Sequence, residues 1–107
     1  GRWAVDWKEN RQFIGFAGLK YIEEVDAVDL GFRFLREYWG MGIATEAGKA
    51  CLDFGFQQLG LDHTIAWVLP ENKASIRVLE KLGLVFEKVL FEEEMLIHQY
   101  KIANTAK

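Results

Sequence analysis

The sequence predicts an α+β (mixed α/β) fold, in which a mostly antiparallel sheet contains one parallel crossover and carries two packed helices. Three observations predict it. Apolar residues alternate near the N-terminus of the 107-residue chain, they follow helical spacing in two central segments, and a strand-like run separates those segments. The expected order is β-β-β-α-β-α-β-β, and its central strand–helix–strand unit implies the parallel connection. No repeat or linker interrupts the pattern, so residues 1–107 are expected to form a single domain.

The N-terminal third is expected to form three strands. Trp3, Val5 and Trp7 alternate with smaller or polar residues, which is typical of a half-buried strand. Residues 13–22 form a second apolar run after a polar turn, which favours a hairpin, and residues 28–35 form a third run after an acidic break.

The apolar spacing then changes to that of a helix. Residues 45–59 carry a broad apolar face, with Thr45 as the expected N-cap and Gly60 placed to end the helix. A β-rich run follows over residues 63–69. This strand provides the second half of the parallel crossover.

A second helix and a terminal hairpin complete the chain. Asn72 is expected to cap the second helix, and Gly83 is expected to end it. Residues 84–90 and 95–102 flank an acidic turn and predict the hairpin.

Composition excludes several classes of function. The formal net charge of −3 gives no electrostatic reason to bind nucleic acid or an anionic membrane. Cys51 is the only cysteine in the sequence, so an internal disulfide and a multi-cysteine metal site are excluded, and no metal is expected. No apolar run approaches the roughly 20 residues of a membrane span, and no signal-peptide pattern is present, so a cytoplasmic protein is expected.

The segment "REYWGMGIATEA", residues 36–47, lies between an expected strand and an expected helix. Gly40 and Gly42 leave its backbone bare, and bare backbone at a helix start is typical of phosphate binding. A P-loop would need a Gly-Lys-Ser/Thr ending, which is absent. A dinucleotide fingerprint would need a third Gly or Ala where Thr45 stands.

Two blocks at the right separation, "WGMGIATEA" and "PENKASIRVLEKLGL", resemble the GNAT superfamily of N-acetyltransferases, and within it the RimJ/RimL-type branch. The resemblance implies a loop of the form Gln/Arg-x-x-Gly-x-Gly/Ala that holds the pyrophosphate of acetyl-CoA. Gly42 and Ala44 match its last two positions, and Trp39 stands where Gln or Arg is usual. The residues expected to contact acetyl-CoA are Phe34, Leu35, Trp39, Gly40, Met41, Gly42, Ile43, Ala44, Thr45 and Asn72.

The resemblance also implies direct transfer of the acetyl group to an amine, either a protein N-terminus or a small molecule. The strand over residues 28–35 is expected to splay from the strand over residues 63–69, which leaves backbone groups free for the pantetheine arm. A backbone N–H at Phe34 or Leu35 would then polarise the thioester carbonyl.

Three residues are candidates for proton transfer. Glu94 lies 19 residues after Ser75, the separation at which the RimL-type pattern carries its base and acid. Asp29 lies where some members carry a catalytic glutamate, and it ranks just behind Glu94 as the base. Ser75 is the expected proton donor to the departing thiolate, because Leu79 stands where a tyrosine is common.

The family's first strand and first two helices have no counterpart before Gly1. The domain is therefore expected to be N-terminally incomplete, or to be completed by a second copy in a homodimer. The alternative to an enzyme is a non-catalytic acyl-CoA-binding remnant or an interaction module.

Overall fold

The structure is a computed structural model that describes residues 2–7 and 9–106, and it confirms the predicted fold class. The elements appear in the expected order, with two short 3₁₀ turns added. They are β1 (Arg2–Asp6), β2 (Phe13–Ile22), a 3₁₀ turn (Glu23–Val25), β3 (Ala27–Phe34), a 3₁₀ turn (Arg36–Tyr38), α1 (Ile43–Gln57), β4 (His63–Val68), α2 (Lys73–Leu82), β5 (Val85–Glu92) and β6 (Met95–Ala103).

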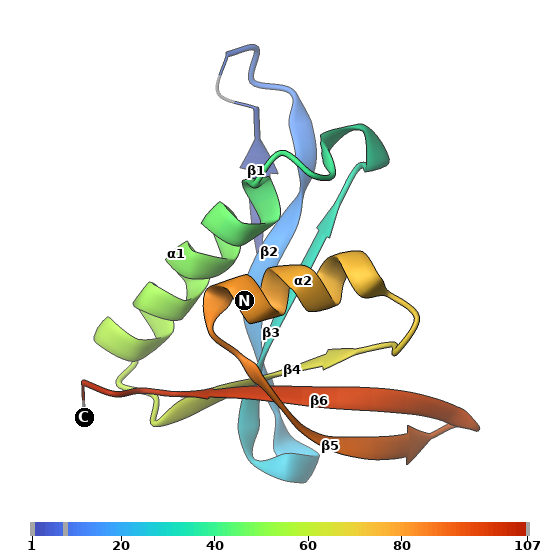
Figure 1. Cartoon of the computed structure of the whole chain (residues 1–107). Helices are drawn as coiled ribbons and strands as arrows, with labels where there is room; N and C mark the ends of the chain where they lie inside the picture. Colours follow the sequence, from blue (N-terminus) through green and yellow to red (C-terminus); the bar gives the residue numbers. More distant parts are fainter. Residues whose placement is uncertain (1, 8, 107) are drawn as a thin grey trace.

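The strands form one sheet in the spatial order β1-β2-β3-β4-β6-β5. Among the described strands, β3 and β4 form the one parallel pair, and the other neighbours are antiparallel. The helices α1 and α2 contact each other and lie on the same face of the sheet (Figure 1). The predicted crossover is therefore β3–α1–β4.

The core lies between the helices and this face of the sheet. Leu19 and Leu30 from the sheet, and Leu52 and Leu79 from the helices, are almost fully buried. Burial of such a side chain stabilises the fold by about 2 kcal/mol. Gly48 lets α1 approach α2 closely, because a Cβ there would lie 2.6 Å from a methyl group of Leu82.

The helix α1 begins two residues before the expected start, so the prediction that Thr45 is its N-cap is wrong. Gly42 is the N-cap, in the left-handed region with φ 79°, and its carbonyl oxygen accepts from the Glu46 N–H at 3.0 Å. A glycine readily adopts the positive φ of this turn, so the helix can begin at Ile43. A cap at Thr45 would instead require Ile43 and Ala44 to be non-helical. The helix ends at Gln57, close to the expected stop.

The ends of α2 are as predicted. The Asn72 side-chain oxygen accepts from the Ser75 N–H at 3.2 Å and caps the helix. Gly83 ends it in the left-handed conformation, with φ 100°. Both signals are local, so they can be read from the sequence without knowledge of the tertiary packing.

The strands β3 and β4 diverge, as expected from the sequence. Eight residue pairs join β2 to β3, whereas the described residues show a single bridge between β3 and β4, at Asp29 and Ile65. Beyond Asp29, β3 runs away from β4 (Figure 1). The backbone edge of β3 that faces β4 is consequently open from this point onward.

Candidate active site

A cavity of about 660 Å³, here called the fork cavity, lies where the open end of β3 meets the N-terminal turns of α1 and α2. It brings together nine of the thirteen residues proposed from the sequence, namely Phe34, Trp39, Gly40, Gly42, Ile43, Ala44, Thr45, Asn72 and Ser75. Four do not line it: Leu35, Met41, Asp29 and Glu94. Sequence reasoning missed its other lining residues, Phe32, Arg33, Tyr38, Ala74, Arg77, Val78 and Lys81.

The glycine loop presents bare backbone to the fork cavity. Gly40 and Gly42 both have positive φ, 77° and 79°, and a Cβ built on either would meet no atom within 4 Å. No side chain caps α1, and its first backbone bond is donated by Glu46. Within the described chain, the N–H groups of Ile43, Ala44 and Thr45 therefore have no acceptor, as is usual for a first helical turn. Together with the helix dipole they favour an anion.

Trp39 links the loop to the end of β3. Its indole Nε1 donates to the Phe34 carbonyl oxygen at 2.9 Å. The guanidinium of Arg36 lies 5.3 Å from the indole ring centre, within range of a cation–π interaction. An indole therefore fixes the loop at the position where the family motif usually has Gln or Arg.

The backbone N–H groups at the end of β3 point in two directions. The Leu35 N–H donates to the Ile14 carbonyl oxygen at 2.9 Å, so this group faces β2 and not the fork. Because N–H groups alternate along a strand, those of Phe34 and Phe32 point the other way, toward the open edge. Phe34 thus remains a candidate to polarise a carbonyl, and Phe32 joins it.

The helix α2 adds polar and cationic groups. Asn72 uses its side-chain oxygen for the cap, and among the described residues its amide nitrogen has no partner. Arg77 and Lys81 are four residues apart, and both line the fork cavity together with Arg33 of β3. No Asp or Glu is among the described lining residues, so the charge of the cavity is positive.

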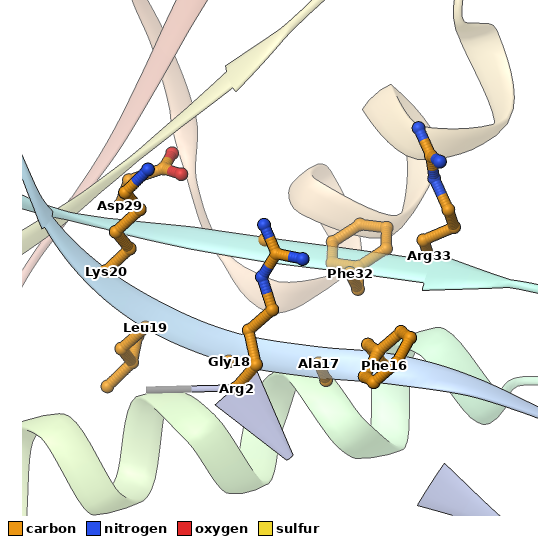
Figure 2. A pocket seen from close by; sticks show the side chains of 10 residues that line it. Arg2, Phe16, Ala17, Gly18, Leu19, Lys20, Asp29, Phe32 and Arg33 are labelled. Atoms are coloured by element: carbon orange, nitrogen blue, oxygen red, sulfur yellow. The ribbon is translucent and has the colours of Figure 1, made fainter. Parts of the chain in front are cut away.

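A second cavity, of about 380 Å³, lies on the face of the sheet opposite the helices and is here called the sheet-face cavity. Leu30 and Phe34 point into the core under the helices, so Asp29, Gly31 and Arg33 of β3 project from the opposite face. Figure 2 shows Asp29 and Lys20 at one end of this cavity and Arg33 at the other. Its lining residues are Arg2, Phe16, Ala17, Gly18, Leu19, Lys20, Asp29, Gly31, Phe32 and Arg33.

The two cavities share a wall. Phe32 and Arg33 line both of them, so the end of β3 is the partition between them. The two cavities therefore adjoin along this strand.

Asp29 stands at the base of the fork. Its Oδ1 accepts from the Trp67 N–H at 3.2 Å, which supplies β4 with an acceptor where backbone pairing ends. Burial raises the pKa of Asp29 from 3.8 to about 6, while the Trp67 hydrogen bond and the positive charge of Lys20 act in the lowering direction. The carboxylate is thus ionised at neutral pH, yet it is a better base than an exposed Asp.

Glu94 lies apart from both cavities. It occupies the turn between β5 and β6, where Glu93 and Glu94 both have positive φ, 49° and 64°. The structure therefore brings Ser75 into the fork cavity and Asp29 into the sheet-face cavity, and it brings Glu94 into neither. The role proposed for Glu94 stays a prediction.

Comparison with known proteins gives the class to which this chain belongs. Residues 1–85 match the family model described as "Acetyltransferase (GNAT) domain". The chain therefore belongs to the GNAT family of acetyltransferases.

Individual relatives agree with this assignment. The chain is 39% identical to the uncharacterized protein YkkB of Bacillus subtilis over 90 residues, covering 82% of this chain and 52% of YkkB. It is 35% identical over 91 residues to the spermidine N(1)-acetyltransferase of Escherichia coli K12, covering 81% and 49%. A crystal structure of a GNAT-family acetyltransferase from Bacillus anthracis superposes with a TM-score of 0.83 at 29% identity, covering 96% of this chain and 66% of that one. The chain spans about half the length of the curated relatives it matches.

Two further kinds of feature are absent from the described residues. None of the helices in residues 2–7 and 9–106 combines the length and apolar character needed to cross a membrane. In the same part of the chain, no group of three or more His, Cys, Asp or Glu side chains is arranged to hold a metal ion.

Proposed function

We propose that this chain is the transferase part of an acetyl-CoA-dependent N-acetyltransferase, which moves the acetyl group to an amine by direct attack. The observation that carries the proposal is the fork cavity, where unpartnered N–H groups at the start of α1 adjoin three cations and, among the described lining residues, no acid. Coenzyme A carries a pyrophosphate and a further phosphate, so its charge is complementary to this lining. Acetyl-CoA supplies the activated acetyl group as a thioester.

The residues present fit this co-substrate. Left-handed Gly40 and Gly42 leave open space beside the loop, and the first-turn N–H groups from Ile43 to Thr45 would hold the pyrophosphate. The amide nitrogen of Asn72 and the open edge of β3 at Phe34 would hold the pantetheine arm. Trp39 positions the loop through its bond to the Phe34 carbonyl oxygen.

Asp29 is our choice for the general base, ahead of Glu94. It lines the cavity that shares a wall with the fork cavity, and Glu94 lines neither. A carboxylate with a pKa of about 6 is ionised at pH 7 and can take the proton of an attacking amine. Ser75 lines the fork cavity and is the group proposed to protonate the departing thiolate.

The acceptor is proposed to be an amine on a small molecule or a protein N-terminus. The likeness to a spermidine N(1)-acetyltransferase supports an amine acceptor without fixing which one. Membership of the RimJ/RimL-type branch rests on the two sequence blocks and stays a proposal. So does a homodimer, which sedimentation velocity would test.

Calorimetric titration with acetyl-CoA, with NAD as the control, is the test of the cofactor assignment. Binding of acetyl-CoA alone supports it, and a response to NAD or to neither ligand refutes it. A thiol-release assay with a panel of amines then tests turnover. Binding without release of free CoA would favour the alternative, a non-catalytic acyl-CoA-binding module.

A further inference from the structure

We propose that the amine acceptor carries an anionic group, a carboxylate or a phosphate, and that the sheet-face cavity binds this group through Arg2, Lys20 and Arg33. The inference rests on the proposed function, because it names the class of amine that the same site accepts. It excludes polyamines as the preferred acceptors.

The strand register gives the sheet-face cavity a bare floor between polar walls. Gly18 of β2 pairs directly with Gly31 of β3, and Arg2 of β1 pairs with Gly18 in the same row. A Cβ on Gly31 would meet only the Oδ2 of Asp29, at 4.0 Å, so the space above Gly31 is open. Neighbouring rows on one face are two residues apart, about 6.6 Å along the strand, so the two rows that flank the glycine row lie about 13 Å from each other.

The flanking rows supply the chemistry. On one side Lys20 pairs with Asp29, and on the other Phe16 pairs with Arg33. An amine that points at Asp29 therefore places the rest of a compact acceptor over the glycine row, with Arg2 at one end of the row and Arg33 beyond it. The proposal places the anionic group of such an acceptor beside these two guanidinium groups.

The charge balance favours an anion. Among the described lining residues of the sheet-face cavity, three are cations and one is a carboxylate, while the whole chain has a formal net charge of −3. The cationic lining is therefore a local feature and not a consequence of composition. The ion pairs found in the described chain are Lys49–Asp53 and Lys101–Glu87, so neither Arg2 nor Arg33 is in such a pair, while Lys20 interacts electrostatically with Asp29.

A polyamine fits this lining poorly. One of its ammonium groups can face Asp29, but its remaining charges would lie beside Arg2, Lys20 or Arg33. Repulsion between these like charges lowers the affinity for a polyamine and so selects against it as an acceptor. An anionic group at the same place would instead form charge-assisted hydrogen bonds.

The test compares four acceptors in the thiol-release assay: 3-aminopropionate, 2-aminoethyl phosphate, propylamine and spermidine. The assays run at pH 8, about two units above the pKa of about 6 that Asp29 has in the parent protein, because removal of Lys20 acts to raise that pKa. We expect the lowest KM for one of the two anionic acceptors. Which of the two it is will show whether the sheet-face cavity prefers a carboxylate or a phosphate. Lys20→Gln should raise that KM about tenfold more than it raises the KM of propylamine in the same variant.

A control variant and a second cavity variant test whether the change in KM arises in the sheet-face cavity. Lys49→Gln removes an exposed cation that is paired with Asp53 on α1, away from the sheet-face cavity, and should leave every KM unchanged. Arg33→Gln should raise the KM of the anionic acceptor. If it raises only the KM of acetyl-CoA, Arg33 serves the fork cavity and its part in the inference is wrong.

A titration monitored by backbone amide NMR tests the inference without a measurement of turnover. In the absence of acetyl-CoA, 3-aminopropionate or 2-aminoethyl phosphate should shift the amide signals of Gly18 and Gly31, and spermidine should not. Failure of acetyl-CoA to bind would refute the proposed function and leave this titration valid. Preference for spermidine, or shifts that Lys20→Gln leaves unchanged, would overturn the inference.

Discussion

Replacing Asp29 by Asn should stabilise the protein at neutral pH while removing its activity. The Asn side-chain oxygen can still accept from the Trp67 N–H, so the fork keeps this hydrogen bond. What is lost is a buried negative charge, whose pKa is raised from 3.8 to about 6. At 1.36 kcal/mol per pH unit, a difference of about two units corresponds to roughly 3 kcal/mol.

The sign follows from proton linkage. Between pH 4 and pH 6 the folded protein keeps the Asp29 proton and the unfolded chain releases it, so the free energy of unfolding falls as the pH rises through this window. The favourable contribution of Asp29 is complete below pH 4 and is lost above pH 6. The amide that replaces the carboxyl group does not titrate, so the Asp29→Asn variant lacks this fall.

Urea unfolding of both proteins at pH 4, 5, 6, 7 and 8 measures the difference. The stability of the Asn variant relative to the parent should increase by up to about 3 kcal/mol from pH 4 to pH 8, with most of the change between pH 4 and pH 6. Other titrating groups contribute equally to the free energy of unfolding of both proteins, so their contributions cancel in this difference. A difference that stays flat with pH, or that falls, would refute the assignment of a raised pKa to Asp29.

The same variant tests the base. Loss of a general base lowers turnover by about 10²–10⁴-fold, and the parent's activity should rise with pH through about 6. Acetyl-CoA binding, measured by calorimetry, should be unchanged, because Asp29 does not line the fork cavity. If the Asp29→Asn variant is more stable but equally active, Glu94 becomes the preferred candidate for the general base.

Three further substitutions probe the fork cavity. Ser75→Ala should lower kcat at least tenfold in the thiol-release assay without changing acetyl-CoA affinity; an unchanged kcat would remove Ser75 from the mechanism. Asn72→Ser keeps a capping oxygen and should weaken acetyl-CoA binding alone, whereas Asn72→Ala should also cost about 1 kcal/mol of stability in urea. Gly42→Ala meets no steric obstacle but must adopt φ 79°, so it should cost about 1–2 kcal/mol and weaken acetyl-CoA binding; full parental stability would contradict the left-handed cap.

The sequence predicted the features that local rules decide. Asn72 and Gly83 mark the ends of α2 because capping depends on adjacent residues alone. Gly40 and Gly42 identified the loop for the same reason. Thr45 shows the limit of such rules, since Gly42 starts the helix earlier through its positive φ.

Features that depend on packing were out of reach. The four-residue spacing of Arg77 and Lys81 places them on one side of α2, but only the tertiary structure shows that this side faces the fork. The direction of the Leu35 N–H depends on its pairing with Ile14, which a single strand does not reveal. The separation of Glu94 from Ser75 likewise depends on the length of the β5–β6 hairpin.

The partition formed by Phe32 and Arg33 has a kinetic consequence. Since the fork cavity and the sheet-face cavity lie on opposite sides of β3, neither ligand crosses the route of the other. Either one can enter first, and each product can depart on its own side while the other stays bound. Initial rates plotted in double-reciprocal form at several fixed concentrations of the second ligand should therefore give intersecting lines, the pattern of sequential addition. Calorimetric binding of each ligand to the free protein would then show that the order is not compulsory.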